Sequence, residues 1–160
     1  MYSSKYFDHL VVFTAGIGMF LSTLDSGIIN VALPTLSKSF NVTPSFITWS
    51  VTLYTLLLTG TIIIFGRLSD KYSRLNIYSL GLTTFLIASI LCGFSNSIMQ
   101  LIVFRGLQGI GAAMLQGTAT AIITTTIPED RQGPALGTLS ILLGIGPVLG
   151  PSIGGLLISI

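Results

Sequence analysis

Charged side chains are scarce in this 160-residue sequence, where Asp, Glu, Lys and Arg together make up 8% of the residues. A soluble domain carries about 25% charged residues, so this composition excludes a water-facing globular surface. Cys92 is the only cysteine and His9 the only histidine, which excludes an internal disulfide and a Cys/His metal cluster, and we expect no cofactor. Hydrophobic residues form 51% of the chain, and the mean hydropathy is +0.88, which predicts a membrane-embedded protein.

Long apolar runs dominate the sequence. A membrane-spanning helix needs roughly 20 mostly apolar residues. Five such runs, separated by polar or proline-containing breaks, cover about 10–34, 46–66, 75–94, 98–120 and 135–157. The first run exceeds the roughly 7–15 residues of a signal-peptide core, so we expect a retained helix. Pro134 is predicted at the first position of the last helix, where its missing N–H costs little. The predicted fold class is an all-α membrane protein.

Lysine and arginine are concentrated in alternate loops. One side of the membrane receives Lys5, Arg67, Lys71, Arg74 and Arg131. The other side receives Lys38 alone. Cytoplasmic loops carry the excess of basic residues. We therefore predict a multi-pass protein of the cell membrane whose N-terminus is cytoplasmic.

Two charges interrupt the apolar runs, Asp25 in the first helix and Arg105 in the fourth. A charge near the bilayer centre costs roughly 3 kcal/mol or more, so it is expected to face a cavity, a partner or a proton path. At about 1.5 Å per residue, the two charges lie within about one helical turn of the same depth. Asn30 and Gln108 add polar groups that we expect in the same cavity. The alternatives are that Arg105 snorkels to the interface and that the amides only join helices.

Four segments have distinctive patterns of glycine, proline and charge, and they lie at 24–34, 66–74, 101–113 and 146–155. Together and in this order they resemble the major facilitator superfamily, and most closely its drug:proton antiporter branch with fourteen helices. Each segment alone is a weak signal, whereas the four in order carry the resemblance. The resemblance implies that residues 1–160 form most of an N-terminal six-helix bundle, an incomplete transporter domain without its sixth helix and its second half.

Segment 66–74 resembles the cytoplasmic loop with which this family closes its inward gate. The gating residues that the resemblance implies are Gly66, Arg67, Asp70 and Arg74. A glycine lets two backbones approach closely, and Asp70 would accept hydrogen bonds from a helix N-terminus or an arginine. Ser73 and Leu75 replace a glycine and a basic residue of the family pattern, so one basic contact is absent. The alternative is a loop that only sets topology.

Segment 146–155 places small residues and prolines in the fifth helix. Its members are Gly146, Pro147, Gly150, Pro151, Gly154 and Gly155. Glycines at four-residue spacing share one face of a helix, and such a face allows close helix packing in lipid. The prolines remove backbone donors and bend the helix. In the resembled family this pattern is associated with exchange, so the resemblance implies antiport. The alternative is a packing face with no bearing on transport direction.

Transport is the function that the resemblance implies, as proton-coupled efflux of small organic or drug-like compounds by alternating access. Asp25 is then the proton-binding carboxylate and Arg105 its conformation-dependent partner. The expected partners are membrane lipid, protons, a small organic substrate and the missing C-terminal half, without nucleic acid. The sequence shows no recognisable nucleophile–base pair or phosphate-binding loop, so we predict that the protein is not an enzyme. The alternatives are a small-metabolite symporter or facilitator fragment and a non-transporting membrane interaction protein.

Overall fold

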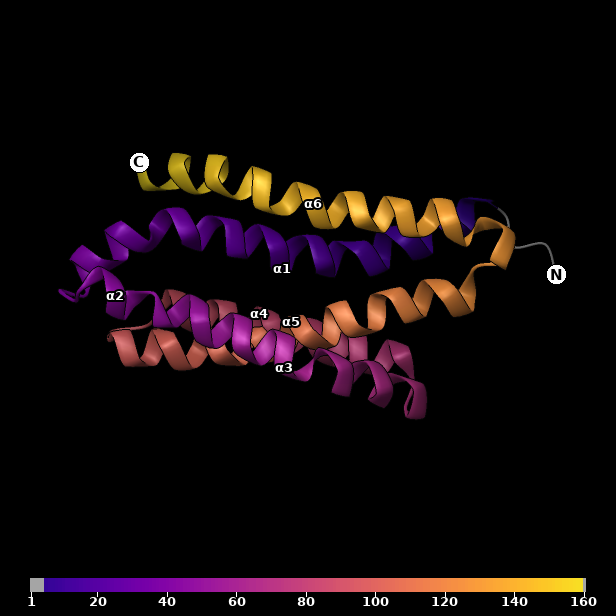
Figure 1. Cartoon of the computed structure of the whole chain (residues 1–160), viewed down its shortest axis with the longest axis horizontal. Coiled ribbons are helices and arrows are strands. Elements are labelled where there is room, and N and C mark those ends of the chain that lie inside the picture. The colour runs from indigo at the N-terminus through magenta and orange to yellow at the C-terminus, as the bar shows by residue number, and fades with distance from the viewer. Residues whose placement is uncertain (1–4, 160) are drawn as a thin grey trace.

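The computed structural model describes residues 5–159, and that range is built from helices and short turns without a strand (Figure 1). The elements are α1 (Lys5–Ser39), α2 (Pro44–Ile47), α3 (Trp49–Lys71), α4 (Arg74–Gly93), α5 (Ile98–Thr126) and α6 (Glu129–Ser159). Within the described residues, five helical stretches are long and apolar enough to cross a membrane, and α2 with α3 forms one of them. The prediction of an all-α protein with five membrane-length helices is therefore confirmed.

The first and last helices are longer than the sequence predicted. α1 continues past Pro34 to Ser39, because a proline removes only its own backbone donor and a helix can pass through it with a bend. The prediction that Pro134 opens the last helix is wrong, since Pro134 lies inside α6. The first turn of α6 instead contains Glu129 and Asp130. Acidic side chains are stabilised at a helix N-terminus by its partial positive charge, which favours this earlier start.

The chain turns after α1 at Asn41, whose φ of 56° lies in the left-handed region. The amides of Asn41 and Val42 donate to the carbonyls of Lys38 and Ser37, at 3.2 and 3.0 Å. These two bonds satisfy carbonyls that the last turn of a helix leaves unpaired, and asparagine is one of the residues that tolerates the conformation. The turn leads through α2 into α3, which runs back along the bundle (Figure 1).

The membrane-length helices form two layers (Figure 1). α1 lies along α6 in one layer, whereas α3 and α4 both pack against α5 in the other. α1 also contacts α5, and this contact joins the layers. α5 is the most buried of the described helices. A polar side chain on its inner face is therefore removed from both lipid and water.

Glycines bring α1 and α6 into backbone contact along a line that we name the α1–α6 seam, formed by Gly27, Gly146, Gly150 and Gly154. A Cβ atom on Gly150 would lie 2.5 Å from Cα of Gly27, which real structures do not allow. A side chain on Gly146 would collide with Thr23 of α1. The face predicted from the four-residue spacing therefore packs against α1.

The other members of this segment lie beside the α1–α6 seam. Pro147 borders it, because a Cβ atom on Gly27 would lie 3.3 Å from Cα of Pro147. Pro151 is exposed, and a Cβ atom on Gly155 would meet no described atom within 4 Å. The packing role is thus carried by the three glycines at four-residue spacing, and the link of the whole segment to antiport stays a prediction.

An ion pair fastens the same two helices near their first turns. Arg131 of α6 donates through Nη1 to Oδ2 of Asp8 on α1, and both side chains are largely buried. In the sequence, Arg131 indicated only the orientation of the chain in the membrane. Asp8 and Arg131 are 123 residues apart, and the sequence does not show that they lie close together. The α1–α6 layer is therefore held by backbone packing at the α1–α6 seam and by charge near the first turns of the two helices.

We predict that Gly150→Leu separates α1 from α6. The added side chain has no space at the α1–α6 seam, and overpacking of this kind destabilises a protein by about 1–3 kcal/mol. The measurement is thermal unfolding of the purified chain in detergent, followed by circular dichroism. Gly144→Leu on the same helix is the matched control, since a Cβ atom there meets no described atom within 4 Å. Equal unfolding temperatures for the two variants would contradict the proposed packing.

Candidate functional site

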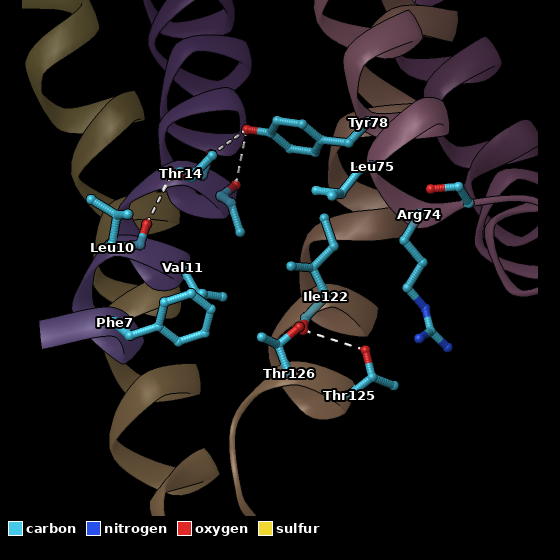
Figure 2. A pocket seen from close by; sticks show the side chains of 12 residues that line it. Phe7, Leu10, Val11, Thr14, Arg74, Leu75, Tyr78, Ile122, Thr125 and Thr126 are labelled. Carbon is cyan, nitrogen blue, oxygen red and sulfur yellow. Dashed lines mark hydrogen bonds between the residues drawn. The ribbon is translucent and has the colours of Figure 1, made fainter. Parts of the chain in front are cut away.

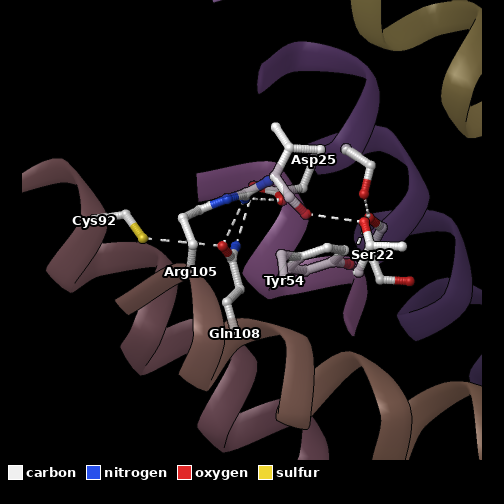
Figure 3. A network of polar contacts seen from close by, with 9 residues as sticks. Ser22, Asp25, Tyr54, Cys92, Arg105 and Gln108 are labelled. Carbon is white, nitrogen blue, oxygen red and sulfur yellow. Dashed lines mark hydrogen bonds and ion pairs between the residues drawn. The ribbon is translucent and has the colours of Figure 1, made fainter. Parts of the chain in front are cut away.

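Asp25 of α1 and Arg105 of α5 form an ion pair inside the helical bundle (Figure 3). Nη1 of Arg105 lies 2.5 Å from Oδ2 of Asp25. The Arg105 side chain is 2% exposed, whereas that of Asp25 is 26% exposed. The pair therefore holds a buried cation against a carboxylate that is still partly accessible at the edge of the site.

Gln108 joins this pair in a polar group of three side chains, which we name the charged cluster. Its Oε1 accepts from Nη1 of Arg105 at 2.7 Å, and its Nε2 donates to Oδ1 of Asp25 at 3.0 Å. Arg105 and Gln108 are three residues apart on α5 and therefore share a helix face. Gln108 is fully buried, so the amide is fixed in one orientation by a cation on one side and an anion on the other.

Tyr54 of α3 lies against the charged cluster, although the sequence analysis did not place it there. Its ring centroid is 4.7 Å from Cζ of Arg105, and its hydroxyl donates to the backbone carbonyl of Ser22 at 3.2 Å. A buried tyrosine needs a partner for its hydroxyl, and this need was the only signal available in the sequence. The partner is a main-chain carbonyl, which every residue carries, so the chain could not indicate which one.

Further hydrogen bonds extend from this region on two sides (Figure 3). Nε2 of Gln116 donates to Oγ of Ser22 at 3.1 Å. The thiol of Cys92 lies 3.9 Å from Oε1 of Gln108, as a weak donor. Four helices, α1, α3, α4 and α5, thus contribute polar groups to one region at the centre of the bundle.

The charged cluster suits a reversible change of charge. An arginine keeps its charge under ordinary conditions, whereas a carboxylate can take up a proton. With Asp25 ionised, the ion pair is neutral as a whole. With Asp25 protonated, the cation of Arg105 has no anion beside it, and an uncompensated buried charge is costly. A change in the charge of Asp25 would therefore change how strongly α1 and α5 are held together.

Asn30, the other polar residue predicted for this cavity, lies apart from the charged cluster. It is exposed on α1 and makes none of the hydrogen bonds described above. Asp25 and Asn30 are five positions apart, which corresponds to about 1.4 turns, so the two side chains leave the helix in different directions. The structure therefore brings together three of the four predicted residues.

The residues predicted to form a gate lie at the end of α3 and the start of α4. Nη2 of Arg74 is 2.6 Å from Oδ1 of Asp70, whose side chain is 61% exposed. Gly66 lies against Gly117 of α5, and Arg67 is exposed at a groove between α3 and α5. The arginine partner that we expected for Asp70 thus comes from the same segment, and the gating role stays a prediction.

A separate cavity of about 430 Å³ lies between α1, α4 and α5 (Figure 2). Its walls are mostly apolar, with Phe7 and Leu10 on one side and Arg74 at the edge. Tyr78 reaches from α4 to α1, where its hydroxyl donates to the carbonyl of Thr14 at 2.6 Å. This cavity contains no member of the charged cluster. We place the candidate site at the charged cluster, because charges inside a membrane span are costly and require a functional explanation.

Comparisons with known proteins agree on the fold and the family. The family model described as Major Facilitator Superfamily matches residues 15–160. The chain is 40% identical over 149 residues to riboflavin transporter RibZ of Clostridioides difficile (strain 630), covering 93% of this chain and 33% of that protein. It is 37% identical over 150 residues to multidrug resistance protein Stp of Mycobacterium tuberculosis (strain CDC 1551 / Oshkosh), covering 93% and 28%. The chain spans about a third of the length of these curated relatives.

A solved structure has the same arrangement of helices. The chain matches a bacterial homologue of the human lysosomal transporter Spinster, in an inward-facing and unoccupied conformation, with a TM-score of 0.86 and 25% identity. The match covers 97% of this chain and 33% of the solved chain. The inward-facing occupied form of that homologue gives the same TM-score at 26% identity. The helical layers described above are therefore those of a known transporter fold.

We predict that Asp25 and Arg105 stabilise the fold as a unit. Asp25→Asn alone leaves the buried Arg105 cation unpaired, which costs about 3–5 kcal/mol, and Arg105→Gln should cost less because Asp25 is partly exposed. The double variant should lose less than the sum of the two, by about 1–3 kcal/mol. The measurement is a double-mutant cycle on the unfolding free energy of the purified chain in detergent.

The exposed pair Asp70–Arg74 provides the control for this cycle. Asp70→Asn and Arg74→Gln should show a coupling of about 0.5 kcal/mol or less, because solvent screens an exposed pair four residues apart on the surface. If the buried pair gave a coupling no larger than this exposed pair, the structural importance assigned to the charged cluster would be wrong.

Proposed function

The chain belongs to the major facilitator superfamily, and we propose that it forms the N-terminal part of a proton-coupled exporter of small organic or drug-like compounds. The observation that carries this proposal is the ion pair between Asp25 and Arg105, buried between two membrane-spanning helices. The distribution of basic residues supports a cytoplasmic N-terminus and a cytoplasmic position for segment 66–74.

Proton exchange at Asp25 is the central step of the proposed cycle. The ionised carboxylate accepts from Arg105 and Gln108 and holds α1 against α5. Uptake of a proton neutralises the carboxylate and weakens these charge-assisted hydrogen bonds. α1 is then free to shift relative to α5, and release of the proton restores the contact. Transporters with internal repeats use such changes to rock one helical bundle against another.

A shift of α1 is transmitted to α6 in this proposal. The α1–α6 seam is a backbone contact, so α6 follows α1 without loss of packing. The segment that forms it resembles the pattern associated with exchange, and this resemblance supports antiport. Where α3 ends and α4 begins, Asp70 and Arg74 form the gating contact of the proposed cycle.

A vitamin-sized metabolite is the second candidate substrate. The relative at 40% identity is named a riboflavin transporter, whereas the one at 37% is named a multidrug resistance protein. Uptake and export of riboflavin and of the dye ethidium, measured in proteoliposomes with the full-length protein, separate the two candidates. Movement of neither compound would favour the remaining alternative, a membrane interaction protein without transport.

We predict that Asp25→Asn in the full-length protein abolishes export driven by a proton gradient, since an amide cannot exchange the proton. The measurement is ethidium export against its own gradient at several imposed pH differences. Binding of ethidium, followed by fluorescence, should persist. Asp25→Glu retains an exchangeable proton and serves as the control. Uphill export by Asp25→Asn with the usual dependence on the pH difference would remove Asp25 from the coupling step.

We also predict that Asp70→Asn slows transport while leaving membrane insertion intact. The substitution removes the negative charge opposite Arg74 but keeps all the basic residues that set topology. Export rate and the amount of protein in the membrane fraction are the two measurements. Glu129→Gln, an exposed acid in the first turn of α6, is the control. Normal export by Asp70→Asn would reduce segment 66–74 to a topology signal.

A further inference from the structure

The guanidinium of Arg105 has more donors than the charged cluster uses. Nη1 donates to both Asp25 and Gln108. Nε and Nη2 are also buried, and neither has a hydrogen-bond partner among the described residues. The cation therefore depends on a single nitrogen for its hydrogen bonds, and on its other surroundings for the rest of its stabilisation.

The face of the Tyr54 ring also lies beside this cation. Cζ of Arg105 lies 4.7 Å from the centre of the ring, within the range of a cation–π contact. Both side chains are buried, at 2% and 3% exposure for Arg105 and Tyr54. Such contacts are stronger when both partners are shielded from water. Figure 3 shows the ring beside the charged cluster, on the α3 side.

The ring is held in place independently of Arg105. The Tyr54 hydroxyl donates to the carbonyl of Ser22 on α1. The backbone carbonyl of Tyr54 touches Gly109 of α5, where any side chain would collide with it. The backbone of Tyr54 is therefore held against α5, the helix that carries Arg105, and its hydroxyl bond to α1 does not involve Arg105.

We propose that Tyr54 is a positioning residue, whose ring holds the Arg105 guanidinium in place when Asp25 is protonated. This inference rests on the proposed proton exchange at Asp25. A protonated Asp25 no longer offers a negative charge, whereas Arg105 stays cationic. The negative face of the ring then becomes the principal electrostatic partner of the cation. Because the ring matters more in the protonated state than in the ionised state, its loss should make Asp25 harder to protonate.

The test measures the protonation of Asp25 directly on the 160-residue chain, without transport. Dicyclohexylcarbodiimide reacts with protonated carboxyl groups in apolar surroundings, and peptide mass spectrometry quantifies the adduct on Asp25 as a function of pH. Tyr54→Leu should lower the proton affinity of Asp25 about tenfold, the order expected for a desolvated cation–π contact. Tyr54→Phe keeps the ring and should titrate like the wild type. Trp49→Leu removes an exposed aromatic from the same helix and is the control.

A second substitution separates ring electrostatics from packing. Pentafluorophenylalanine at position 54 keeps the shape of phenylalanine but reverses the charge distribution of the ring face, so it should titrate like Tyr54→Leu even if that variant folds poorly. An unchanged titration in the fluorinated variant would overturn the proposal. A shift in Tyr54→Phe as large as in Tyr54→Leu would also overturn it, since the hydroxyl would then be the active group. Absence of any adduct on wild-type Asp25 at all pH values would instead overturn the proposed proton exchange itself, and this inference with it.

Discussion

A permanent positive charge in the middle of a helical bundle needs partners, and three helices place groups around Arg105. α1 provides a carboxylate, α5 itself provides an amide, and α3 provides an aromatic face. Gly109 lets the backbones of α3 and α5 touch at Tyr54, which brings the aromatic face to the guanidinium. The contact between the Arg105 cation and the Tyr54 ring thus depends on the absence of a side chain at Gly109.

The membrane spans and the common depth of Asp25 and Arg105 could be predicted from the sequence because both depend on quantities that run along a single helix. Length and hydropathy define the spans, and the rise per residue placed Asp25 and Arg105 at one depth. These quantities do not give the direction in which a side chain leaves the helix. Asn30 was expected in the same cavity on its polarity, yet it leaves α1 in another direction and is exposed.

Among the contacts that could not be predicted from the sequence are side-chain hydrogen bonds to main-chain carbonyls, which every residue type carries. Tyr54 and Tyr78 both donate to main-chain carbonyls of α1, so no second residue in the sequence marks either contact. The ends of α1 and α6 were misplaced for a related reason. A proline is a strong local signal, but the energy of one missing hydrogen bond is small beside the packing of a whole helix.

The two tyrosine hydroxyls place no requirement on the side chains of the α1 residues that they bond. A main-chain carbonyl is present whatever the side chain, so Thr14 and Ser22 can be exchanged for other residues without losing the acceptors that Tyr78 and Tyr54 use. The tyrosines have no such freedom, because only their side chains supply the donor. Each contact therefore constrains the tyrosine position and not the position that provides the carbonyl. In a set of homologous sequences the two tyrosines would be retained while their partners varied. Methods that infer contacts from correlated substitutions would overlook these contacts, because no pair of positions would covary.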